Sequence, residues 1–108
     1  MVVKQFEVYL VALDPTKGSE IQKTRPCVVI SPNEMNTFLN TVFIIPLTST
    51  KKAYPTRVSC TFENKDGQAA IEQMRAVDKV RLVKKLGSFK DRVFMERVTN
   101  ILKDMFTL

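Results

Sequence analysis

The sequence predicts one small domain over residues 1–108 that is mainly β and carries a helix at its C-terminal end. Three observations lead to this class. A chain of 108 residues usually forms a single core. Its first two-thirds hold short runs of β-branched residues between turn residues, and its last segment changes to helical spacing. Five or six short strands with intervening turns favour a small barrel, because closure removes exposed sheet edges.

The expected strands begin near the N-terminus. The first three are apolar runs rich in β-branched residues: residues 7–13 (EVYLVAL), 27–30 (CVVI) and 41–47 (TVFIIPL). Pro26 and Pro46 fit strand ends or bulges, because proline cannot donate to a ladder. Residues 56–62 alternate as a half-buried strand does.

Turns and loops separate these strands. Gly67 after Asp66 predicts a tight turn, after which residues 68–77 resume extended structure. Residues 14–24 form one long loop, and a second long loop begins at Ser31.

The last segment predicts a helix. Its apolar residues recur at helical spacing and form one stripe: Val93, Phe94, Val98, Ile101, Leu102 and Met105. Ser88 and Asp91 form a candidate capping pair, since a hydroxyl accepts from an orphan amide and a carboxylate faces the positive helix end. Lys103 suits the opposite pole.

Charge favours an anionic partner. The net charge of +6 and the pI of about 9.6 are compatible with nucleic acid, an acidic peptide or a membrane surface. Four basic residues cluster, although a solvated face explains them equally well: Lys79, Arg81, Lys84 and Lys85. No apolar run approaches the roughly 18 residues of a membrane span. Residues 1–6 hold no apolar signal region, so we expect a cytoplasmic protein with no membrane partner.

The residue types restrict the chemistry. The sequence has no histidine, which removes the commonest general base and the commonest metal ligand. Cys27 and Cys60 stand alone in apolar stretches, so we expect buried thiols in a reducing compartment rather than a metal site. A bond between them stays open. No metal and no cofactor are expected.

Three segments are candidates for function. Residues 14–20 (DPTKGSE), followed by Arg25, are long for a connection between two strands, and such loops are often functional. The alternative is a polar surface loop in which Arg25 only pairs with Glu20. Residues 46–52 (PLTSTKK) place hydroxyls and two lysines at a strand end, which suits phosphate oxygens or merely the local backbone. Gln73 and Arg75 share a strand face, a weak signal alone.

Together these segments closely resemble the signature of the MazF/PemK toxins of bacterial toxin–antitoxin pairs. The matching strings are LDPTKGSE (13–20), TRPCVVISP (24–32), PLTS (46–49) and EQMRAVDKVRL (72–82). They cover nearly the whole chain in the right order. The chain departs from the family at residues 6–9 (FEVY), where Gly-Asp-(Ile/Val)-(Trp/Tyr) is frequent.

The resemblance implies a fold, an activity and partners. The fold is an SH3-like, CcdB/MazF-type β-barrel with a C-terminal helix, working as a homodimer. The activity is sequence-specific, metal-independent cleavage of single-stranded RNA (mRNA). The inhibitor is an acidic antitoxin protein with a disordered tail.

The family's motif arginine maps onto Arg25 and its strand-end threonine onto Thr48, which we expect to be catalytic. The chemistry is compatible, because RNA carries its own 2′-hydroxyl nucleophile, with an effective molarity of roughly 10⁵ M or more when well oriented. Arg25 would stabilise the phosphorane charge and Thr48 would hold the scissile phosphate. Glu20 is the candidate base, or only orients Arg25.

Five further residues are expected to bind RNA: Lys17, Ser49, Lys51, Gln73 and Arg75. Two other functions remain as alternatives. One is a CcdB-like, protein-binding gyrase poison, which the tail at residues 105–108 (MFTL) disfavours because those toxins end in a Trp-Gly-Ile type sequence. The other is an RNA-binding barrel without catalysis.

Overall fold

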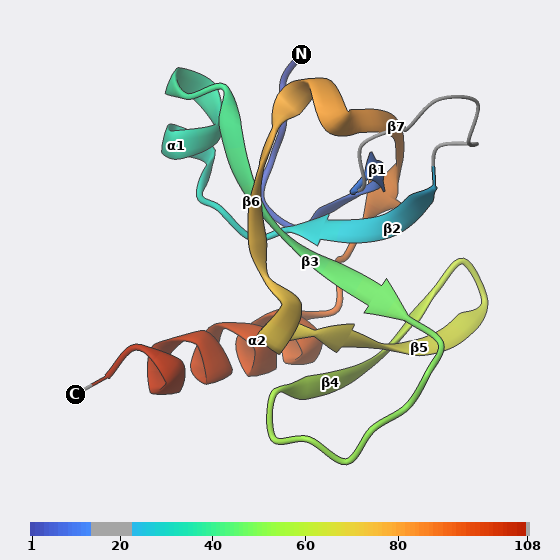
Figure 1. Ribbon diagram of the computed structural model, residues 1–108. Coiled ribbons are helices and arrows are strands. Elements are labelled where there is room, and N and C mark those ends of the chain that lie inside the picture. Colours follow the sequence, from blue (N-terminus) through green and yellow to red (C-terminus); the bar gives the residue numbers. More distant parts are fainter. Residues whose placement is uncertain (14–22, 108) are drawn as a thin grey trace.

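The computed structural model describes residues 1–13 and 23–107, which form a bent antiparallel sheet with two helices (Figure 1). The strands are β1 (Glu7–Ala12), β2 (Thr24–Val29), β3 (Thr41–Thr48), β4 (Arg57–Phe62), β5 (Lys65–Ala70), β6 (Arg75–Asp78) and β7 (Leu82–Ser88). The helices are α1 (Asn33–Phe38) and α2 (Arg92–Met105), with 3₁₀ turns η1 (Ile71–Gln73) and η2 (Lys79–Arg81). The prediction of a mainly β fold with a C-terminal helix is confirmed.

β3 is the central strand of the sheet. The order is β4-β5-β3-β2-β1-β7, and β6 also pairs with β3. At Ile44, β2 pairs with one edge of β3 and β6 with the other, while β5 takes over at Leu47 and Thr48. Along the described strands the pairing path ends at β4 and β7, so this sheet curves without hydrogen-bonded closure.

Both faces of the sheet are buried. Val8, Val28 and Ile45 belong to a cluster that packs against α2. Cys27 and Ile44 point the other way, into a second cluster. Because successive residues of a strand face opposite sides, a strand buried on both sides is apolar throughout. This explains the continuous apolar runs of the first three predicted strands.

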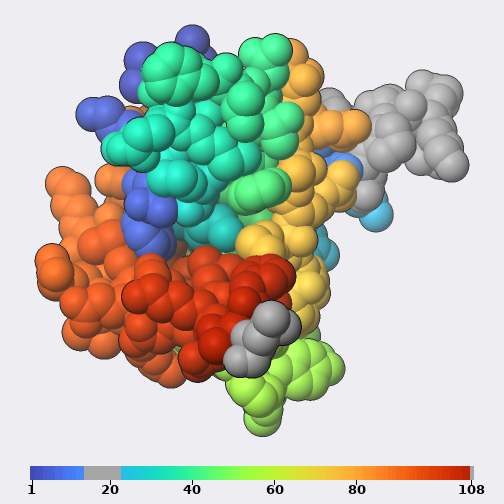
Figure 2. Space-filling model, turned by 90° about the vertical axis from the view of Figure 1, so that its left-hand side faces the viewer, coloured from blue at the N-terminus to red at the C-terminus, as the bar shows by residue number. Residues whose placement is uncertain are grey.

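α2 follows its predicted stripe only in part. Phe94 and Val98 are buried, whereas Val93 is 66% exposed and lies off the packed face. The capping prediction was half wrong: Asp91 accepts from the amides of Val93 (3.0 Å) and Phe94 (3.3 Å), whereas Ser88 is the last residue of β7. In Figure 2, α2 (red) spans the lower part of the face and α1 (teal) lies above it.

α1 lies where a loop was expected. Its buried Asn36 donates to the Ser31 carbonyl (2.9 Å), and the Ser31 hydroxyl donates to Asn36 Oδ1 (2.5 Å). The Asn36 amide also bonds to the Pro32 carbonyl (3.0 Å). The Phe43 amide of β3 also donates to the Ser31 hydroxyl (3.1 Å), so α1 is held by polar contacts that apolar periodicity does not reveal.

The predicted turn at Gly67 was wrong. The turn between β4 and β5 is made by Glu63 and Asn64, which both have positive φ (51° and 63°), as tight hairpins require. Gly67 lies within β5 instead, where a Cβ atom would come 2.6 Å from the Thr48 carbonyl oxygen. The expected extended segment 68–77 is interrupted by η1.

Both cysteines are free thiols; Cys27 is buried as expected, whereas Cys60 is only half-buried. Burial raises the pKa of Cys60 to about 11, with a further contribution from the negative charge of Asp66. Burial also raises the pKa of Cys27, to about 12. Thiols with such pKa values stay protonated and unreactive near neutral pH.

Candidate functional site

Arg25 and Thr48 lie at the same end of two neighbouring strands. β2 and β3 run antiparallel, and their last registered pair toward this end is Cys27–Pro46. Arg25 and Thr48 each stand two residues beyond that pair, Arg25 exposed on β2 and Thr48 half-buried as the last residue of β3. The sheet register therefore brings the two predicted catalytic residues to one edge of the molecule.

Arg25 lines an open, basic pocket of about 450 Å³. The residues around it come from four separate segments: Leu13, Lys23, Arg25, Pro46, Gln73 and Arg75. Arg75 donates from Nη1 to the Leu13 carbonyl (3.2 Å) and so stands along the wall of the pocket. The positive charges of Arg25 and Arg75 both act on the nearby Cys27 thiol, although burial outweighs them and raises its pKa.

The basic pocket joins three of the predicted residues and adds one. Arg25, Gln73 and Arg75 meet there although β2 and η1 are far apart in sequence. Lys23 was not predicted, and its only signal was its place next to the Thr24–Arg25 motif. Three cationic side chains around one hollow suit an anion such as a phosphodiester.

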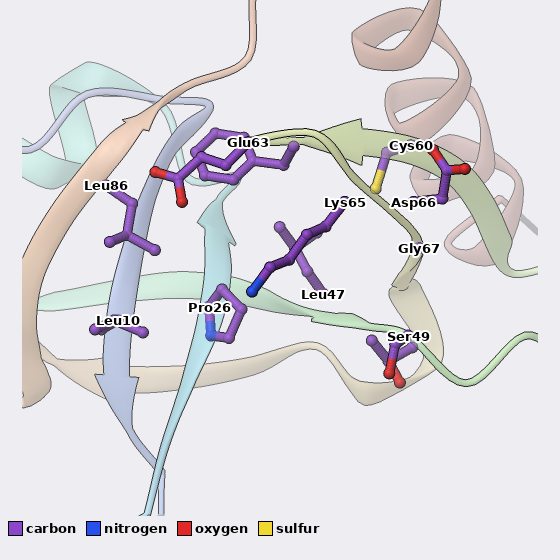
Figure 3. A pocket seen from close by; sticks show the side chains of 12 residues that line it. Leu10, Pro26, Leu47, Ser49, Cys60, Glu63, Lys65, Asp66, Gly67 and Leu86 are labelled. Atoms are coloured by element: carbon purple, nitrogen blue, oxygen red, sulfur yellow. The ribbon is translucent and has the colours of Figure 1, made fainter.

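Thr48 and Ser49 line a second pocket, of about 410 Å³ (Figure 3). Its lining is mostly apolar, with Leu10, Pro26 and Leu47 among the residues of the sheet. Pro26 follows Arg25 along β2. Adjacent residues of β2 and β3 thus line different pockets, Arg25 and Pro46 the basic one and Pro26 and Leu47 the apolar one.

The loop after β3 begins at Ser49, directly after Thr48. The Thr50 amide donates to Thr48 Oγ1 (3.1 Å), which turns the chain and leaves the Thr48 hydroxyl proton available as a donor. Gln68 of β5 pairs with Thr48 across the ladder. Lys51 is exposed in this loop and borders a separate hollow with Ser59 and Asp66, not the basic pocket.

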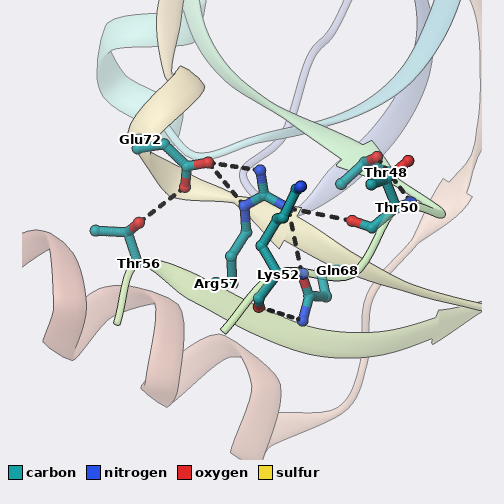
Figure 4. Close-up of polar contacts among 7 residues, drawn as sticks. All are labelled: Thr48, Thr50, Lys52, Thr56, Arg57, Gln68 and Glu72. Carbon is teal, nitrogen blue, oxygen red and sulfur yellow. Dashed lines mark hydrogen bonds and ion pairs between the residues drawn. The ribbon is translucent and has the colours of Figure 1, made fainter. Parts of the chain in front are cut away.

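A polar network that sequence reasoning missed surrounds this loop (Figure 4). Arg57 bonds to Glu72 from both Nε and Nη2 (2.7 Å each), and its Nη1 donates to the Thr50 carbonyl (3.2 Å). Burial by itself would raise the pKa of Glu72, but hydrogen bonds from Thr56 and Arg57 lower it below its ordinary value. The residues of this polar network come from β4, β5, η1 and a loop, so their spacing in the sequence gave no sign that they would meet.

The predicted basic cluster is partly structural. Arg81 donates to the Ala12 carbonyl (3.0 Å), and Lys79 donates to the Asn36 carbonyl. Lys85 pairs with the buried Glu7 carboxylate (2.5 Å). These three charges therefore join elements of the fold, a role that neither the anionic-partner nor the solvated-face interpretation had assigned to them.

Glu7 occupies the position where the chain departs from the family signature. Burial would raise the pKa of Glu7, but bonds from Lys85, the Lys4 amide and the Tyr9 hydroxyl lower it below its ordinary value. Burial and the Glu7 charge raise the pKa of Tyr9 to about 12.

Two predicted site residues, Lys17 and Glu20, lie outside the described residues. Within the described part of the chain, no group of three His, Cys, Asp or Glu side chains is placed to hold a metal ion. The helices described here are all too short or too polar to cross a membrane.

The comparisons with known proteins agree on one family. The family model described as "PemK-like, MazF-like toxin of type II toxin-antitoxin system" matches residues 4–106. The endoribonuclease toxin MazF of Escherichia coli (strain K12) is 37% identical over 67 residues, which make up 62% of this chain. The match spans 60% of the length of that relative.

Solved structures share the fold at lower identity. MazF from Deinococcus radiodurans superposes with a TM-score of 0.80 at 22% identity, covering 100% of this chain and 99% of that one. An endoribonuclease in complex with its cognate antitoxin, from Mycobacterial species, has a TM-score of 0.78 at 21% identity and covers 94% and 92%. Because the family model spans nearly all of the sequence and the fold agrees throughout, the chain belongs to the PemK-like, MazF-like toxin family of type II toxin–antitoxin systems.

Proposed function

We propose that this chain is a sequence-specific, metal-independent endoribonuclease that cleaves single-stranded RNA, including mRNA. The observation that carries the proposal is the edge where Arg25, near the start of β2, and Thr48, at the end of the neighbouring β3, lie beside a basic pocket. The names of related proteins support it, since the similar Escherichia coli protein is an endoribonuclease toxin.

The reaction needs no group beyond the RNA and the protein. The 2′-oxygen forms a bond to phosphorus and the bond from phosphorus to the 5′-oxygen breaks. The products are a 2′,3′-cyclic phosphate and a 5′-hydroxyl. Glu20 is the proposed acceptor of the 2′-hydroxyl proton, or only orients Arg25, in which case water accepts that proton. The leaving 5′-oxygen takes a proton from Arg25 or from water.

The protein contributes charge and alignment. Arg25 stabilises the extra negative charge on the phosphorane, because its planar guanidinium can bind two phosphate oxygens at once. Thr48 donates its hydroxyl to the scissile phosphate and thereby fixes the phosphorus relative to the 2′-oxygen.

Binding of the RNA is assigned to the residues around this edge. Gln73 and Arg75 read bases from the basic pocket, where they face the same space as Arg25. Lys17, Ser49 and Lys51 hold phosphates or riboses without reading sequence.

We further propose that the protein works in the cytoplasm as a homodimer, neutralised by an acidic antitoxin whose disordered tail folds over the RNA-binding face. The net charge of +6 suits such a partner. A MazE–MazF complex from Deinococcus radiodurans has the same fold in its toxin chain, with a TM-score of 0.82 at 22% identity.

One experiment tests the activity and the mechanism. Purified protein is incubated with a long single-stranded RNA in excess EDTA, and the new ends are mapped. We expect cleavage at one short sequence, with a 2′,3′-cyclic phosphate on one fragment and a 5′-hydroxyl on the other. A single deoxyribose on the 5′ side of the scissile bond should stop cleavage, while one on the 3′ side should not.

Other outcomes discriminate between the alternatives. Activity that dies with EDTA and returns with magnesium would contradict the mechanism. Binding of RNA without cutting would favour a non-catalytic RNA-binding barrel. Neither binding nor cutting, together with capture of gyrase, would favour the CcdB-like class.

A further inference from the structure

Arg57 is an unusually enclosed arginine. Its side chain is 6% exposed, although arginine is mostly found on protein surfaces. All three guanidinium nitrogens have partners: Nε and Nη2 bond to Glu72, and Nη1 bonds to the Thr50 carbonyl and to Gln68 Oε1 (3.2 Å each). The ring of Tyr54 lies 5.2 Å from the guanidinium carbon. Removing this charge from water costs free energy, and the hydrogen bonds of the guanidinium offset that cost.

Gln68 fastens the loop beside it. Its buried side-chain amide accepts from the Lys52 amide (3.0 Å) and donates to the Lys52 carbonyl (3.1 Å), so Lys52 pairs with a side chain as it would with a strand. Arg57 holds the same amide oxygen and also the Thr50 carbonyl. The loop after Thr48 is thus tied to the sheet at two points, the Thr50 carbonyl and the Lys52 backbone.

Glu72 connects this network to the η1 segment beside the basic pocket. Its carboxylate accepts from the Thr56 hydroxyl (2.8 Å) at the end of the same loop and from Arg57. Glu72 belongs to η1, and the next residue in sequence, Gln73, lines the basic pocket. The guanidinium of Arg57 therefore joins the η1 segment to the loop after Thr48.

We propose that Arg57 is a positioning residue, which sets the loop after Thr48 relative to the η1 segment without touching RNA. This inference rests on the proposed function. A shift of about 1 Å at a remote residue can lower a rate by about 10²-fold, so loss of the network should act on the chemical step.

The test compares Arg57→Met and Arg57→Lys with the wild-type protein. For Arg57→Met we expect kcat to fall by between about 10- and 100-fold, with a smaller change in KM, because groups that contact RNA remain. Arg57→Lys keeps the charge, but one ammonium cannot reach Glu72, Gln68 and the Thr50 carbonyl together. Its Tm should lie near that of the wild type while its kcat stays near that of Arg57→Met.

Two control variants separate positioning from general stability. Arg92→Met removes an exposed ion pair with Glu96 on α2 (2.9 Å), and its kcat should equal that of the wild type. Val98→Ala opens a void in the core under α2 and should lower Tm without lowering kcat at temperatures where it is folded. A wild-type kcat in Arg57→Met would overturn the proposal. So would an equal loss of kcat in Val98→Ala at a matched Tm.

Hydrogen exchange makes the proposal testable without activity. The Lys52 amide should exchange faster in Arg57→Met than in the wild type, while the Met95 amide of α2 should not change. If the wild-type protein cuts no RNA, the proposed function fails, but faster exchange at Lys52 still supports the loop contact. Unchanged exchange at Lys52 overturns the positioning role whether or not RNA is cut.

Discussion

At the scale of single residues, Arg25 and Thr48 differ in what the surrounding protein demands of them. Arg25 is exposed at the open end of β2, so its identity contributes little to packing. Thr48 is half-buried and its oxygen accepts from the Thr50 amide. Replacing Arg25 should therefore change activity without changing stability. Thr48 needs a substitution of the same shape, so that packing is kept when the hydroxyl is removed.

Four substitutions test both roles. Arg25→Ala and Thr48→Val should each lower kcat by about 10²- to 10³-fold, the usual effect of removing one donor to a transition-state charge. Arg25→Lys should recover little, because the bidentate fork is lost, and Thr48→Ser should stay near the wild type. The Tm of Arg25→Ala should stay close to the wild-type value, since surface changes cost within about 0.5 kcal/mol. RNA cleavage and thermal melts measure these effects, and full activity in Arg25→Ala would remove it from the mechanism.

At the scale of elements, close contacts between strands explain residues that look unremarkable in sequence. Gly67 is needed because β5 approaches the end of β3 so closely that any side chain would meet the Thr48 carbonyl. Glu7 is needed because it links β1 to β7 through Lys85. Both contacts shape the sheet whose edge carries the candidate site.

The Glu7–Lys85 pair predicts a pH dependence of stability. The pKa of Glu7 is lower in the folded protein than its ordinary value of 4.5. The carboxylate therefore stabilises the fold above pH 4.5, and this contribution is lost as pH falls toward the folded-state pKa. The Tm difference between wild type and Glu7→Gln should be largest near pH 7 and should shrink toward pH 3. Glu96→Gln on exposed α2 is the matched control, and a difference that grows in acid would contradict the assignment.

At the scale of the whole molecule, three of the 17 lysines and arginines gather around the basic pocket. Several basic side chains elsewhere serve the fold, as Arg81 does through the Ala12 carbonyl. Lys23, Arg25 and Arg75 instead surround open space. Some basic side chains thus bond within the fold, and others face open space where an anionic ligand could bind.

Salt dependence of RNA binding tests this division. With Thr48→Val as a cleavage-defective background, the logarithm of the association constant should fall linearly with the logarithm of salt concentration, by about 0.7 per phosphate contacted. Adding Arg75→Ala should weaken binding; if Arg75 contacts a phosphate, the slope should also fall by about 0.7. Adding Arg97→Ala, an exposed α2 residue, should leave the slope unchanged. Equal effects of both substitutions would place RNA elsewhere.

Much of the fold was predictable because its signals are local. β1 and β3 are apolar runs and β4 alternates because burial on one or both faces sets a repeating pattern of residue types along each strand. α2 has its own periodicity and a cap, Asp91, within four residues of its buried Phe94. Arg25, Thr48, Gln73 and Arg75 were recognised through their motifs, and the structure places Arg25, Gln73 and Arg75 around one pocket.

What only the tertiary structure decided depends on groups distant in sequence. The turn is made by Glu63 and Asn64, whereas Gly67 lies within β5, where its close approach to the Thr48 carbonyl leaves no room for a side chain. Thr48 lines the apolar pocket rather than the basic pocket, at the point where β3 pairs with β5. Composition and spacing determined the mainly β class and the basic character of this chain. The enclosure of Arg57 followed only from folding, since a buried charge is tolerated where several elements bring partners to it at once.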